Sequence, residues 1–421
     1  MNLPSDQPFA AFIGIDWADT KHDICLQPAG SDKRELIVLA HRPEDIDVWA
    51  CALRDRFQGQ PLAVCLELTR GPIVHALQKY DFFVLFPVNP ETLAKYRQAF
   101  APSRAKDDPT DAQLQMELLL HHRDKLRALK PQSTAMRKLL RLVEQRRRLV
   151  GEKCRTTNRL TDALKQYYPQ ALECFETRDT GIFCDFLTRW PTLRQAQQAR
   201  KTTLENFFRE HHVPSLSVTQ RRITALKNAL PLTEDPAVIE PNALLVQALL
   251  EQLRVTLQAV KRFDAEIALV AETLPDYALF RALPGAGPAL APRLLTAFGE
   301  QRERYASAAE FQKCAGIAPV TERSGQKSWV HWRWQCSAFL RQTLVEWAGE
   351  TISRSFWAGT YYRQQRDKGS SHQAAVRALA FKWTRILYRC WKTKTPYDES
   401  TYLNALRRHG SPLLEQMAKA A

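Results

Sequence analysis

The stretch Ala105-Lys106-Asp107-Asp108-Pro109-Thr110-Asp111-Ala112 decides the fold of the first part of this chain, and it runs into the helical segment Leu114 to Leu120. Proline favours the first turn of a helix, and Asp107 or Asp108 just before it can accept hydrogen bonds from free N–H groups. The pattern predicts a helix that begins here, with Asp108 and Asp111 on one face. Two carboxylates so placed repel each other unless a cation, commonly a divalent metal ion, lies between them. The alternative is a helix cap followed by a solvent-exposed aspartate.

The segments before this stretch alternate between strand and helix patterns. Three short strands come first, followed by two amphipathic helices and two apolar runs typical of buried strands. The expected strands are residues 9–15, 22–27, 35–40, 62–66 and 82–88, and the expected helices between them are residues 43–57 and 72–79. Three strands followed by helix, strand, helix, strand and helix is the order of the ribonuclease-H-like fold, so we predict an α/β domain of this type.

Acidic residues fall at one edge of the predicted sheet. Asp16 ends the first strand, Glu67 follows the fourth, and the helix of Asp108 and Asp111 reaches the same edge. Four convergent carboxylates suit a two-metal site for phosphoryl transfer, and oxygen ligands favour Mg²⁺ or Mn²⁺ over zinc. Each acid alone has a simpler interpretation, as a turn cap for Asp16 and a surface charge for Glu67.

The stretch Ile13 to Lys21 supports a rival interpretation, because it is similar to the first phosphate loop of sugar kinases and actin-like ATPases. Such loops need glycines that let backbone N–H groups approach a phosphate. Trp17 and Ala18 occupy the positions where glycine would help, and no glycine-rich second loop follows. The missing glycines disfavour a kinase.

Composition points to a polyanionic partner. The 421 residues are enough for two or three domains, and 60 Lys and Arg against 45 Asp and Glu leave a net charge of +15. Nucleic acid is the first expectation and an anionic membrane surface the second. No apolar run approaches the roughly 20 residues of a membrane span, so we expect an intracellular protein without a membrane segment. Nine cysteines without C-x-x-C spacing predict reduced thiols.

Two long helical segments with coiled-coil spacing follow. Between Lys130 and Arg159 there are ten Lys or Arg against two Glu, which predicts a basic arm. The candidate phosphate contacts on it are Arg146, Arg147 and Arg148. Residues 243–274 repeat the spacing and are compatible with the return arm of an antiparallel coiled coil, which could also pair with a second protomer. Residues 169–241 give no chemical signal.

Two glycine-containing turns lie further along. The turn Pro284-Gly285-Ala286-Gly287-Pro288 is similar to a helix-hairpin-helix signature, in which Gly285 and Gly287 let the backbone approach a phosphate, although a packed turn between two helices is equally compatible. The loop 320–334 is basic and interleaves tryptophans with His and Arg, which suits base stacking and phosphate contact. Ser324 in this loop is, from sequence alone, a turn residue without a neighbouring His–Asp pair to activate it. The candidate contacts around it are Arg323, Lys327, Trp329 and Arg333, with Trp332 and Trp334.

The ordered set of motifs resembles the DEDD transposases of insertion-sequence class one-hundred-and-ten, the bridge-RNA-guided serine recombinases. The matching motifs are, in order, Gly14-x-Asp16, the strand-end Glu67, Lys106-x-Asp108-x-x-Asp111-Ala112, the turn Pro284 to Pro288, and Ala315 to Pro319 with Ser324-Gly325. Each motif alone is weak, whereas the ordered set spans both ends of the chain and is specific.

The resemblance implies a RuvC-like domain in which Asp16, Glu67, Asp108 and Asp111 bind Mg²⁺. It implies that Ser324 attacks the DNA backbone and forms a covalent phosphoserine intermediate. It implies that donor and target DNA are the substrates and that a structured bridge RNA is the guide. It also implies a homo-dimer or tetramer in which each active site combines residues of two protomers. The expected location is the bacterial cytoplasm, at the nucleoid. Asp107 departs from the pattern, because relatives often have Thr or Ser there.

The predicted architecture is α/β plus all-α, in three parts. Residues 1–125 are expected to form the RuvC-like catalytic domain, residues 126–275 the basic coiled-coil region, and residues 276–421 a mostly helical transposase domain with the helix-hairpin-helix-like turn and the serine. Two other functions stay open. One is a metal-dependent, structure-selective nuclease that uses only the four acids, and the other is a non-catalytic nucleic-acid scaffold.

Overall fold

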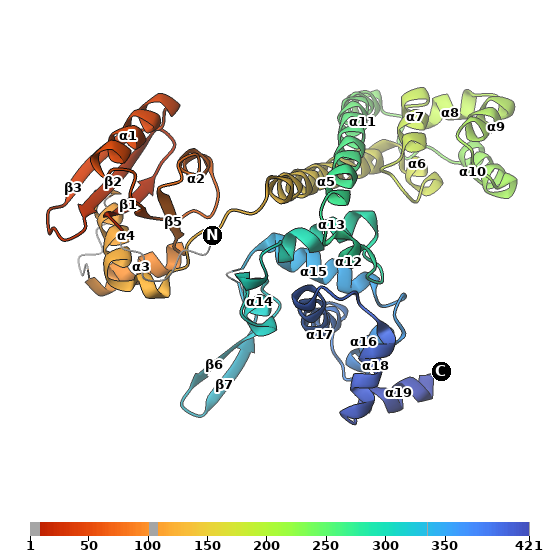
Figure 1. The fold of residues 1–421 in the computed structure, drawn as a ribbon. Helices are drawn as coiled ribbons and strands as arrows, with labels where there is room; N and C mark the ends of the chain where they lie inside the picture. The colour runs from red at the N-terminus through yellow and green to blue at the C-terminus, as the bar shows by residue number, and fades with distance from the viewer. Residues whose placement is uncertain (1–8, 101–107, 335, 421) are drawn as a thin grey trace. The chain divides into compact units, whose positions relative to one another are not determined.

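The computed structural model describes residues 9–100, 108–334 and 336–420, without the side chains of residues 100, 108, 419 and 420. The chain divides into two compact units, Met1–Pro131 and Gln132–Ala421. The first unit is α/β and the second is mostly helical (Figure 1). The prediction of a mixed α/β N-terminal part followed by a helical remainder is therefore confirmed.

A five-stranded mixed sheet forms the centre of the first unit, in the order β3-β2-β1-β4-β5. The strands β1, β2 and β3 form an antiparallel meander, and β4 and β5 continue parallel to β1. The strands are β1 Ala11–Trp17, β2 Lys21–Pro28, β3 Glu35–Ala40, β4 Leu62–Leu66 and β5 Phe83–Pro87. All five strands lie where the sequence pattern predicts them, within two residues at most ends.

Helices cover both faces of this sheet. They are α1 Pro43–Arg56, α2 Pro72–Leu77, α3 Pro90–Phe100 and α4 Asp108–His122. Alternate strand residues such as Ile13 and Val64 pack with α1 and α2, whereas Ala63 and Cys65 pack with α3 and α4. Helix α4 begins at Asp108 with Pro109 in its first turn, as predicted, and α3 is an additional helix that the sequence analysis did not separate.

The approach of α4 to the sheet explains Gly14. A Cβ atom at this position would lie 1.9 Å from the carbonyl oxygen of Ala112 and 2.6 Å from the backbone nitrogen of Met116. Both distances are far below van der Waals contact, so only glycine allows the helix backbone to rest directly on β1. This contact fixes α4, and with it Asp111, against the strand that carries Asp16.

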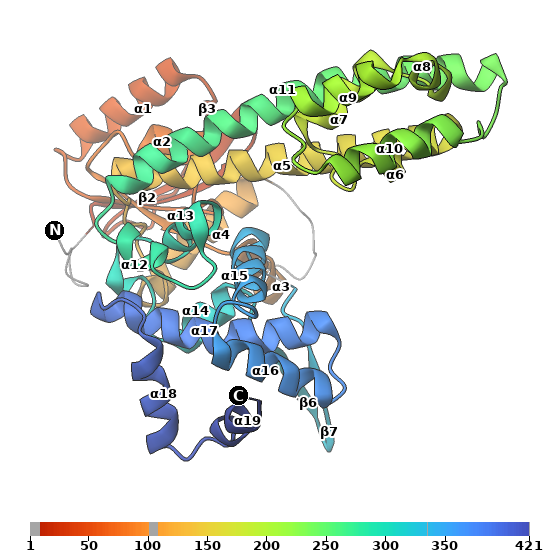
Figure 2. The same cartoon turned by 90° about the vertical axis from the view of Figure 1, so that its right-hand side faces the viewer.

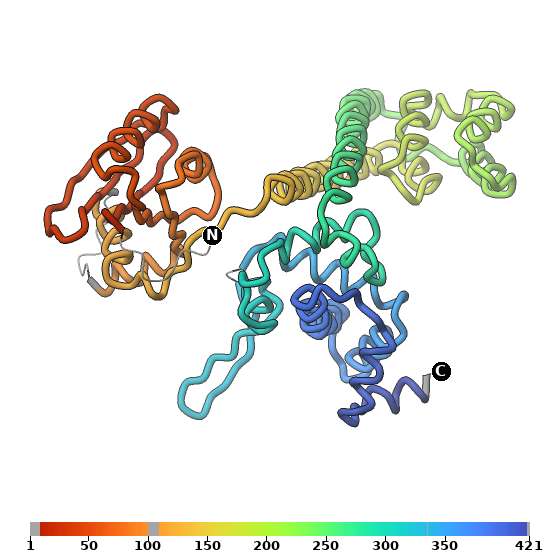
Figure 3. Tube along the Cα trace, in the orientation of Figure 1, coloured from red at the N-terminus to blue at the C-terminus, as the bar shows by residue number. Residues whose placement is uncertain are grey.

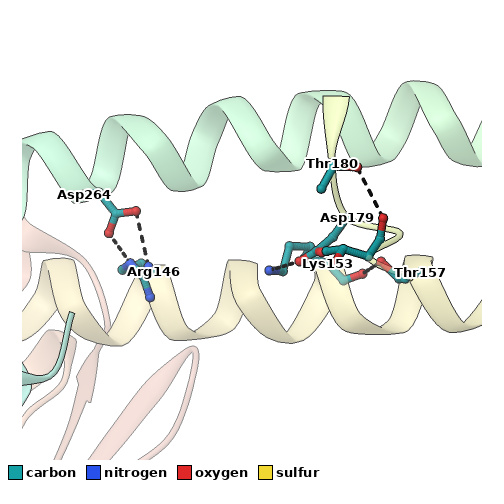
Figure 4. A network of polar contacts seen from close by, with 7 residues as sticks. Arg146, Lys153, Thr157, Asp179, Thr180 and Asp264 are labelled. Atoms are coloured by element: carbon teal, nitrogen blue, oxygen red, sulfur yellow. Dashed lines mark hydrogen bonds and ion pairs between the residues drawn. The ribbon is translucent and has the colours of Figure 1, made fainter. Parts of the chain in front are cut away.

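A two-helix arm opens the second unit. Helix α5 Thr134–Tyr167 and helix α11 Pro236–Glu272 lie side by side and antiparallel (Figure 2). Arg146 of α5 forms a two-pronged ion pair with Asp264 of α11, with Nη2 to Oδ2 at 3.2 Å, and Lys153 of α5 pairs with Asp179 before α7 (Figure 4). The predicted antiparallel return arm is thereby confirmed.

Helix α11 is, among the described residues, the one helix long and apolar enough to cross a membrane by length and composition. It contributes Val246 and Leu253 to one core and Ile267 and Ala271 to another, and it carries Asp264 in an ion pair. These contacts account for its apolar face as part of the arm.

The segment between α5 and α11 forms short helices at the distal end of the arm (Figure 3). They are α6 Pro169–Cys174, α7 Gly181–Arg189, α8 Leu193–Gln198, α9 Lys201–Glu210 and α10 Leu216–Asn228. Their core is aromatic, with Phe183, Phe186 and Phe208 fully buried. Residues 169–241, which gave no chemical signal, thus form a small helical domain at the end of the arm.

The remaining helices pack as a bundle around the proximal end of the arm. They are α12 Tyr277–Arg281, α13 Gly287–Phe298, α14 Ala308–Cys314, α15 Ala338–Glu350, α16 Phe356–Asp367, α17 His372–Thr393, α18 Glu399–Arg408 and α19 Pro412–Ala420. Trp347, Trp357, Trp383 and Trp391 are buried at its centre. A two-stranded hairpin, β6 Val320–Ser324 and β7 Lys327–His331, extends from the end of α14 (Figure 1).

Candidate functional site

Asp16 and Glu67 occupy equivalent positions on two neighbouring parallel strands. Ile15 of β1 pairs with Leu66 of β4, so the next residue on each strand is one of the two acids. Ile15 and Leu66 are buried on the α1–α2 face, and because side chains alternate along a strand, the acids belong to the face covered by α4. Burial raises the pKa of Cys65 on that face to about 12, and the carboxylate of Glu67 contributes to the shift.

Helix α4 contacts the same end of β1 through Gln115. The Gln115 side chain is fully buried, and its Oε1 accepts a hydrogen bond from the backbone N–H of Ile15 at 3.2 Å. This bond satisfies a strand N–H group one residue before Asp16. Gln115 lies four residues after Asp111, so both share one face of the helix.

Asp111 is buried, 3% exposed, and its charge is balanced within the protein. The Nε of Arg97, on α3, donates to Asp111 Oδ1 at 2.7 Å, and a second guanidinium nitrogen contacts the same oxygen. A buried carboxylate requires such a partner, because burial of an unpaired charge costs several kcal/mol. Arg97 is therefore the cation beside Asp111 in this structure.

The other predicted acid of α4 is only partly described. Asp108 begins the helix, whereas its side chain, Lys106 and Asp107 lie outside the described residues. Among the described side chains no group of three or more His, Cys, Asp or Glu is close enough to hold a metal ion. The structure therefore does not gather Asp16, Glu67 and Asp111 into one metal-binding group. All three are carboxylates, the ligand type that Mg²⁺ and Mn²⁺ prefer.

Ser324 lies at the tip of the β6–β7 hairpin and is exposed. Gly325 follows it with φ of 56°, the left-handed conformation that a two-residue hairpin turn requires. Ser324 pairs across the hairpin with Lys327, and Glu322 pairs with Trp329. Because side chains alternate between faces, Ser324, Lys327 and Trp329 share one face.

Arg323 has a different orientation from the serine. It pairs with Ser328, and this pair belongs to the opposite face of the hairpin. The hairpin thus places one cation, Lys327, beside the serine hydroxyl and another, Arg323, on the far side. Of the two predicted charge partners, only Lys327 shares the face of Ser324.

The base of the hairpin carries a His–Glu pair. His331 Nε2 lies 2.9 Å from Glu322 Oε1, and its Nδ1 lies 2.6 Å from the carbonyl oxygen of Trp332. These two hydrogen bonds raise the pKa of His331, with the carboxylate as the larger cause. His331 pairs with Val320, four residues before Ser324, so it is too far along the strand to accept the serine proton directly.

A cavity of about 510 Å³ lies between the end of this hairpin and helices α16 and α17. Trp332 lines it, with the guanidinium of Arg377 3.6 Å from its ring centroid and that of Arg341 5.5 Å away. These arginines contact one part of the Trp332 ring, and the side chain stays 39% exposed. Trp334, 77% exposed, and Trp329, 44% exposed, keep free ring surface. Arg333 lines the same cavity, and its Nε has no hydrogen-bond partner among the described residues.

The predicted helix-hairpin-helix turn connects α12 and α13. Gly285 has φ of 73° and Gly287 has φ of 53°. A Cβ at Gly285 would lie 3.0 Å from atoms of Glu350, whereas one at Gly287 would meet open space. Trp347 Nε1 also donates to the carbonyl oxygen of Pro284 at 2.9 Å. Gly285 therefore allows close packing against α15, whereas Gly287 has open space beside it for an external ligand.

Several residues that contact the predicted site residues were not identified from the sequence. Arg97 belongs to α3 and Asp111 to α4, fourteen residues apart, so no local spacing signals the pair. Gln115 could have been found, because it shares the helix face of Asp108 and Asp111. Arg377 and Arg341 approach Trp332 only through tertiary packing of α17 and α15.

Comparison with known families identifies the class of protein to which this α/β unit and helical unit belong, that of the transposases. A transposase family model matches residues 13–169, which include the sheet, α4 and α5. A second model, that of the IS116/IS110/IS902 transposase family, matches residues 277–363, which include the turn and the hairpin. The chain belongs to this insertion-sequence transposase family, as the sequence motifs indicated.

Two curated relatives from Streptomyces coelicolor extend the match. The "Mini-circle putative transposase for IS117" is 27% identical over 423 residues, covering 98% of this chain and 100% of the relative. An uncharacterised protein of insertion element IS110 is 25% identical over 303 residues, covering 70% of this chain and 73% of that protein. The first match runs along nearly the whole of both chains.

Proposed function

We propose that this transposase cuts and rejoins DNA through a covalent bond between Ser324 and the DNA backbone. The observation that carries the proposal is the position of Ser324, exposed at a hairpin tip with Lys327 on the same face. An exposed tip can enter a DNA groove and reach a phosphate, and Lys327 can contact the same phosphate. The Trp329 ring on this face offers a surface for a neighbouring base.

The chemical step conserves the phosphodiester. The Ser324 oxygen attacks the phosphorus, a new Ser–O–P bond forms, and one P–O bond to the DNA sugar breaks. The serine proton ends on the sugar oxygen that leaves as a hydroxyl. A DNA hydroxyl from another strand then attacks the phosphoserine, restores the serine hydroxyl and joins the new strand. No net hydrolysis occurs, so strand exchange needs no ATP.

The N-terminal unit is proposed to be a ribonuclease-H-like, RuvC-like domain that supports this step. Its strand order and the edge position of Asp16 and Glu67 favour this assignment. Asp16, Glu67, Asp108 and Asp111 would hold Mg²⁺ or Mn²⁺, which stabilises developing negative charge on phosphate oxygens when it is bound. Among the described residues, no hydrogen bond joins the Ser324 hydroxyl to a base, and Glu322, on the same face, is paired with His331. We therefore expect activation of the serine by groups outside the hairpin.

The partners are proposed to be donor and target DNA and a structured guide RNA that supplies sequence specificity by base pairing. The net charge of +15 and the basic arm suit these polyanions. The arm also carries outward apolar side chains, Leu244, Val255 and Leu269, each at least 65% exposed. Such residues favour pairing of two protomers along the arm, and a dimer or tetramer would let one protomer's acids act with another's serine. The proposed location is the bacterial cytoplasm, at the nucleoid.

The test is a search for the covalent intermediate. Purified protein is incubated with Mg²⁺, end-labelled donor and target DNA, and the RNA transcribed from its own element. Labelled DNA that migrates with protein after denaturation, and is released by protease, is the expected product. Ser324→Ala should abolish this adduct. Ser328→Ala is the matched control, because Ser328 is exposed on the other face of the same hairpin.

Three results are informative. An adduct lost in Ser324→Ala and kept in Ser328→Ala supports the serine recombinase. Cleavage without an adduct, unchanged in Ser324→Ala but lost in Asp16→Ala, would replace it with the metal-dependent nuclease. If the protein binds DNA without cleaving it, and neither Ser324→Ala nor Asp16→Ala changes this binding, the non-catalytic scaffold would be the remaining function.

A further inference from the structure

A second cavity of about 510 Å³ lies where the arm meets the helical bundle, between α5, α13 and α15. Its lining includes Arg146, Arg147, Arg148, Arg155 and Arg293 against only two carboxylates, Glu152 and Glu346. Asp264 brings a third carboxylate to Arg146 from α11. Among the described residues, the five arginines therefore exceed the three carboxylates by two charges.

A connected set of polar contacts holds the floor of this cavity. Arg293 Nη1 donates to Glu346 Oε2 at 2.6 Å and its Nε to Thr343 Oγ1 at 3.2 Å. Gln342 Nε2 donates to the other Glu346 oxygen at 2.5 Å, and its Oε1 accepts from Arg147 Nε at 2.5 Å. The two arginines are thus fixed on either side of Gln342, with their orientation set by α15.

One donor in this set is unused. Arg293 Nη2 is buried and has no hydrogen-bond partner among the described residues. Burial lowers the pKa of Arg293 against an opposing effect of Glu346, and the nearby charges of Arg147 and Arg146 add to the lowering. A buried guanidinium nitrogen without an acceptor is costly. An anion in the cavity would satisfy this donor and offset the repulsion among the arginines.

We propose that this cavity binds a phosphate of a nucleic-acid backbone, held between Arg293, Arg147 and Arg148. Arginine matches a phosphate because its planar guanidinium can donate two parallel hydrogen bonds to two oxygens. Arg148 lines the cavity and is exposed, and no ion pair of its side chain is found among the described residues. A phosphate seated here is fixed against both the arm and the bundle. The site would position nucleic acid without reading its sequence.

This inference rests on the proposed function, because it assumes that nucleic acid is the polyanion that reaches the arm. It adds a defined anchoring point to that function. Cys154, exposed on α5, lines the cavity, and its thiol offers a local probe. Alkylation of Cys154 can be followed by mass spectrometry and does not depend on catalysis.

The experiment measures binding and Cys154 alkylation on the full-length protein. The probes are a DNA duplex, a structured RNA hairpin and poly-glutamate. The variants are Arg293→Gln and the exposed Arg148→Gln, which leaves the core intact. Arg159→Gln, an exposed arginine on the same helix outside the cavity, is the matched control. Thermal unfolding of each variant confirms that it is folded.

Nucleic acid should slow alkylation of Cys154 in the wild type and in Arg159→Gln, but not in Arg293→Gln. Arg293→Gln and Arg148→Gln should each weaken binding by roughly tenfold relative to Arg159→Gln, and for duplex DNA reduce the salt slope by about 0.9 for each lost phosphate contact. The probe that protects Cys154, DNA or RNA, identifies the source of the phosphate.

Four outcomes would overturn the site. If all three variants bind nucleic acid as tightly as the wild type does, the cavity is not the anchor, and the proposed function stands. The same holds if Cys154 is alkylated at one rate with and without nucleic acid. Protection by poly-glutamate equal to that by nucleic acid would make the cavity a general carboxylate site. A wild type that binds neither DNA nor RNA would reject the cavity and the proposed function together.

Discussion

Arg97 of α3 donates through Nε to Asp111 Oδ1 at 2.7 Å, and Asp111 is almost completely buried at the start of α4. The guanidinium side chain is itself only 18% exposed. An ion pair this sheltered neutralises a carboxylate that would otherwise repel any acid nearby. The pair therefore links the position of α3 to the net charge at the sheet edge that carries Asp16 and Glu67.

Replacement of Arg97 by methionine tests this role. Arg97→Met keeps much of the side-chain volume but leaves Asp111 without a counter-charge. We expect the free energy of unfolding to fall by about 3 kcal/mol, the range found when one partner of a buried pair is removed. Urea denaturation of the variant and the wild type measures the difference.

The same variant should respond more strongly to Mg²⁺. If Asp111 is a metal ligand, loss of Arg97 frees its oxygens, so Mg²⁺ should raise the melting temperature of Arg97→Met more than that of the wild type. NaCl at equal ionic strength controls for screening. The double variant Arg97→Met/Asp111→Asn should recover part of the stability and lose the specific Mg²⁺ effect. An equal Mg²⁺ effect in the single and double variants would exclude Asp111 as a ligand.

Gly14 is expected to tolerate no side chain. In Gly14→Ala the new methyl group would overlap the carbonyl oxygen of Ala112, which belongs to the backbone of α4 and cannot rotate away. Helix α4 must then shift off β1, at a cost of about 1–3 kcal/mol or more. Gly30→Ala is a useful comparison, since no atom lies within 4 Å of a Cβ there, although its φ of 72° also disfavours alanine. Denaturation should show the larger loss at Gly14.

The order of elements could be predicted from the sequence, because each signal is local. Strands of β-branched and apolar residues, a proline at the start of α4 and heptad spacing in α5 and α11 all act within a few residues. The sheet and the antiparallel arm follow from such patterns. Gly14 and Asp16 could be recognised as a motif, but the reason for Gly14 appears only with α4 in place.

The rest depends on contacts between distant segments. The pair Arg97–Asp111 and the cluster around Arg293 combine residues from separate helices whose packing no local pattern encodes. The small domain of residues 169–241 escaped detection for a related reason, since its helices are short and become stable only through a shared aromatic core. Side-chain roles at the serine hairpin depend on the cross-strand register, which the sequence alone leaves open.

A buried histidine predicts loss of stability in acid. His22 of β2 is fully buried, and its Nε2 lies 2.9 Å from His41 Nδ1. Burial, with a further contribution from His41, lowers the pKa of His22 from 6.5 to about 4, against an opposing effect of Asp23. The unfolded chain takes up this proton near pH 6.5, whereas the folded chain resists it until about pH 4.

Stability from His22 should therefore be complete above pH 6.5 and decline as the pH falls toward 4. The full loss is at most about 3 kcal/mol for a shift of this size. Urea denaturation between pH 4 and pH 8 measures it. His22→Gln should be less stable at neutral pH but should show a shallower decline. A decline of equal steepness in the variant would assign the effect to other groups.

The exposed ring of Trp334 should contribute to nucleic-acid binding without supporting the fold. The ring is 77% exposed and lies 5.4 Å from the His331 ring at the base of the serine hairpin. Because stacking of one base on an aromatic ring contributes about 1–3 kcal/mol, Trp334→Ala should weaken binding of single-stranded DNA or RNA by about tenfold. Its melting temperature should stay close to that of the wild type.

Phe356→Ala is the matched control, because Phe356 is 46% exposed on α16 of the same unit. Salt titration separates stacking from charge. Trp334→Ala removes no phosphate contact, so its salt slope should equal that of the wild type, whereas loss of a cation such as Lys327 should reduce the slope by about 0.7 for a single strand. Equal binding by Trp334→Ala and Phe356→Ala would show that the Trp334 ring faces solvent in the complex. Weaker binding with an unchanged salt slope would place a base on it.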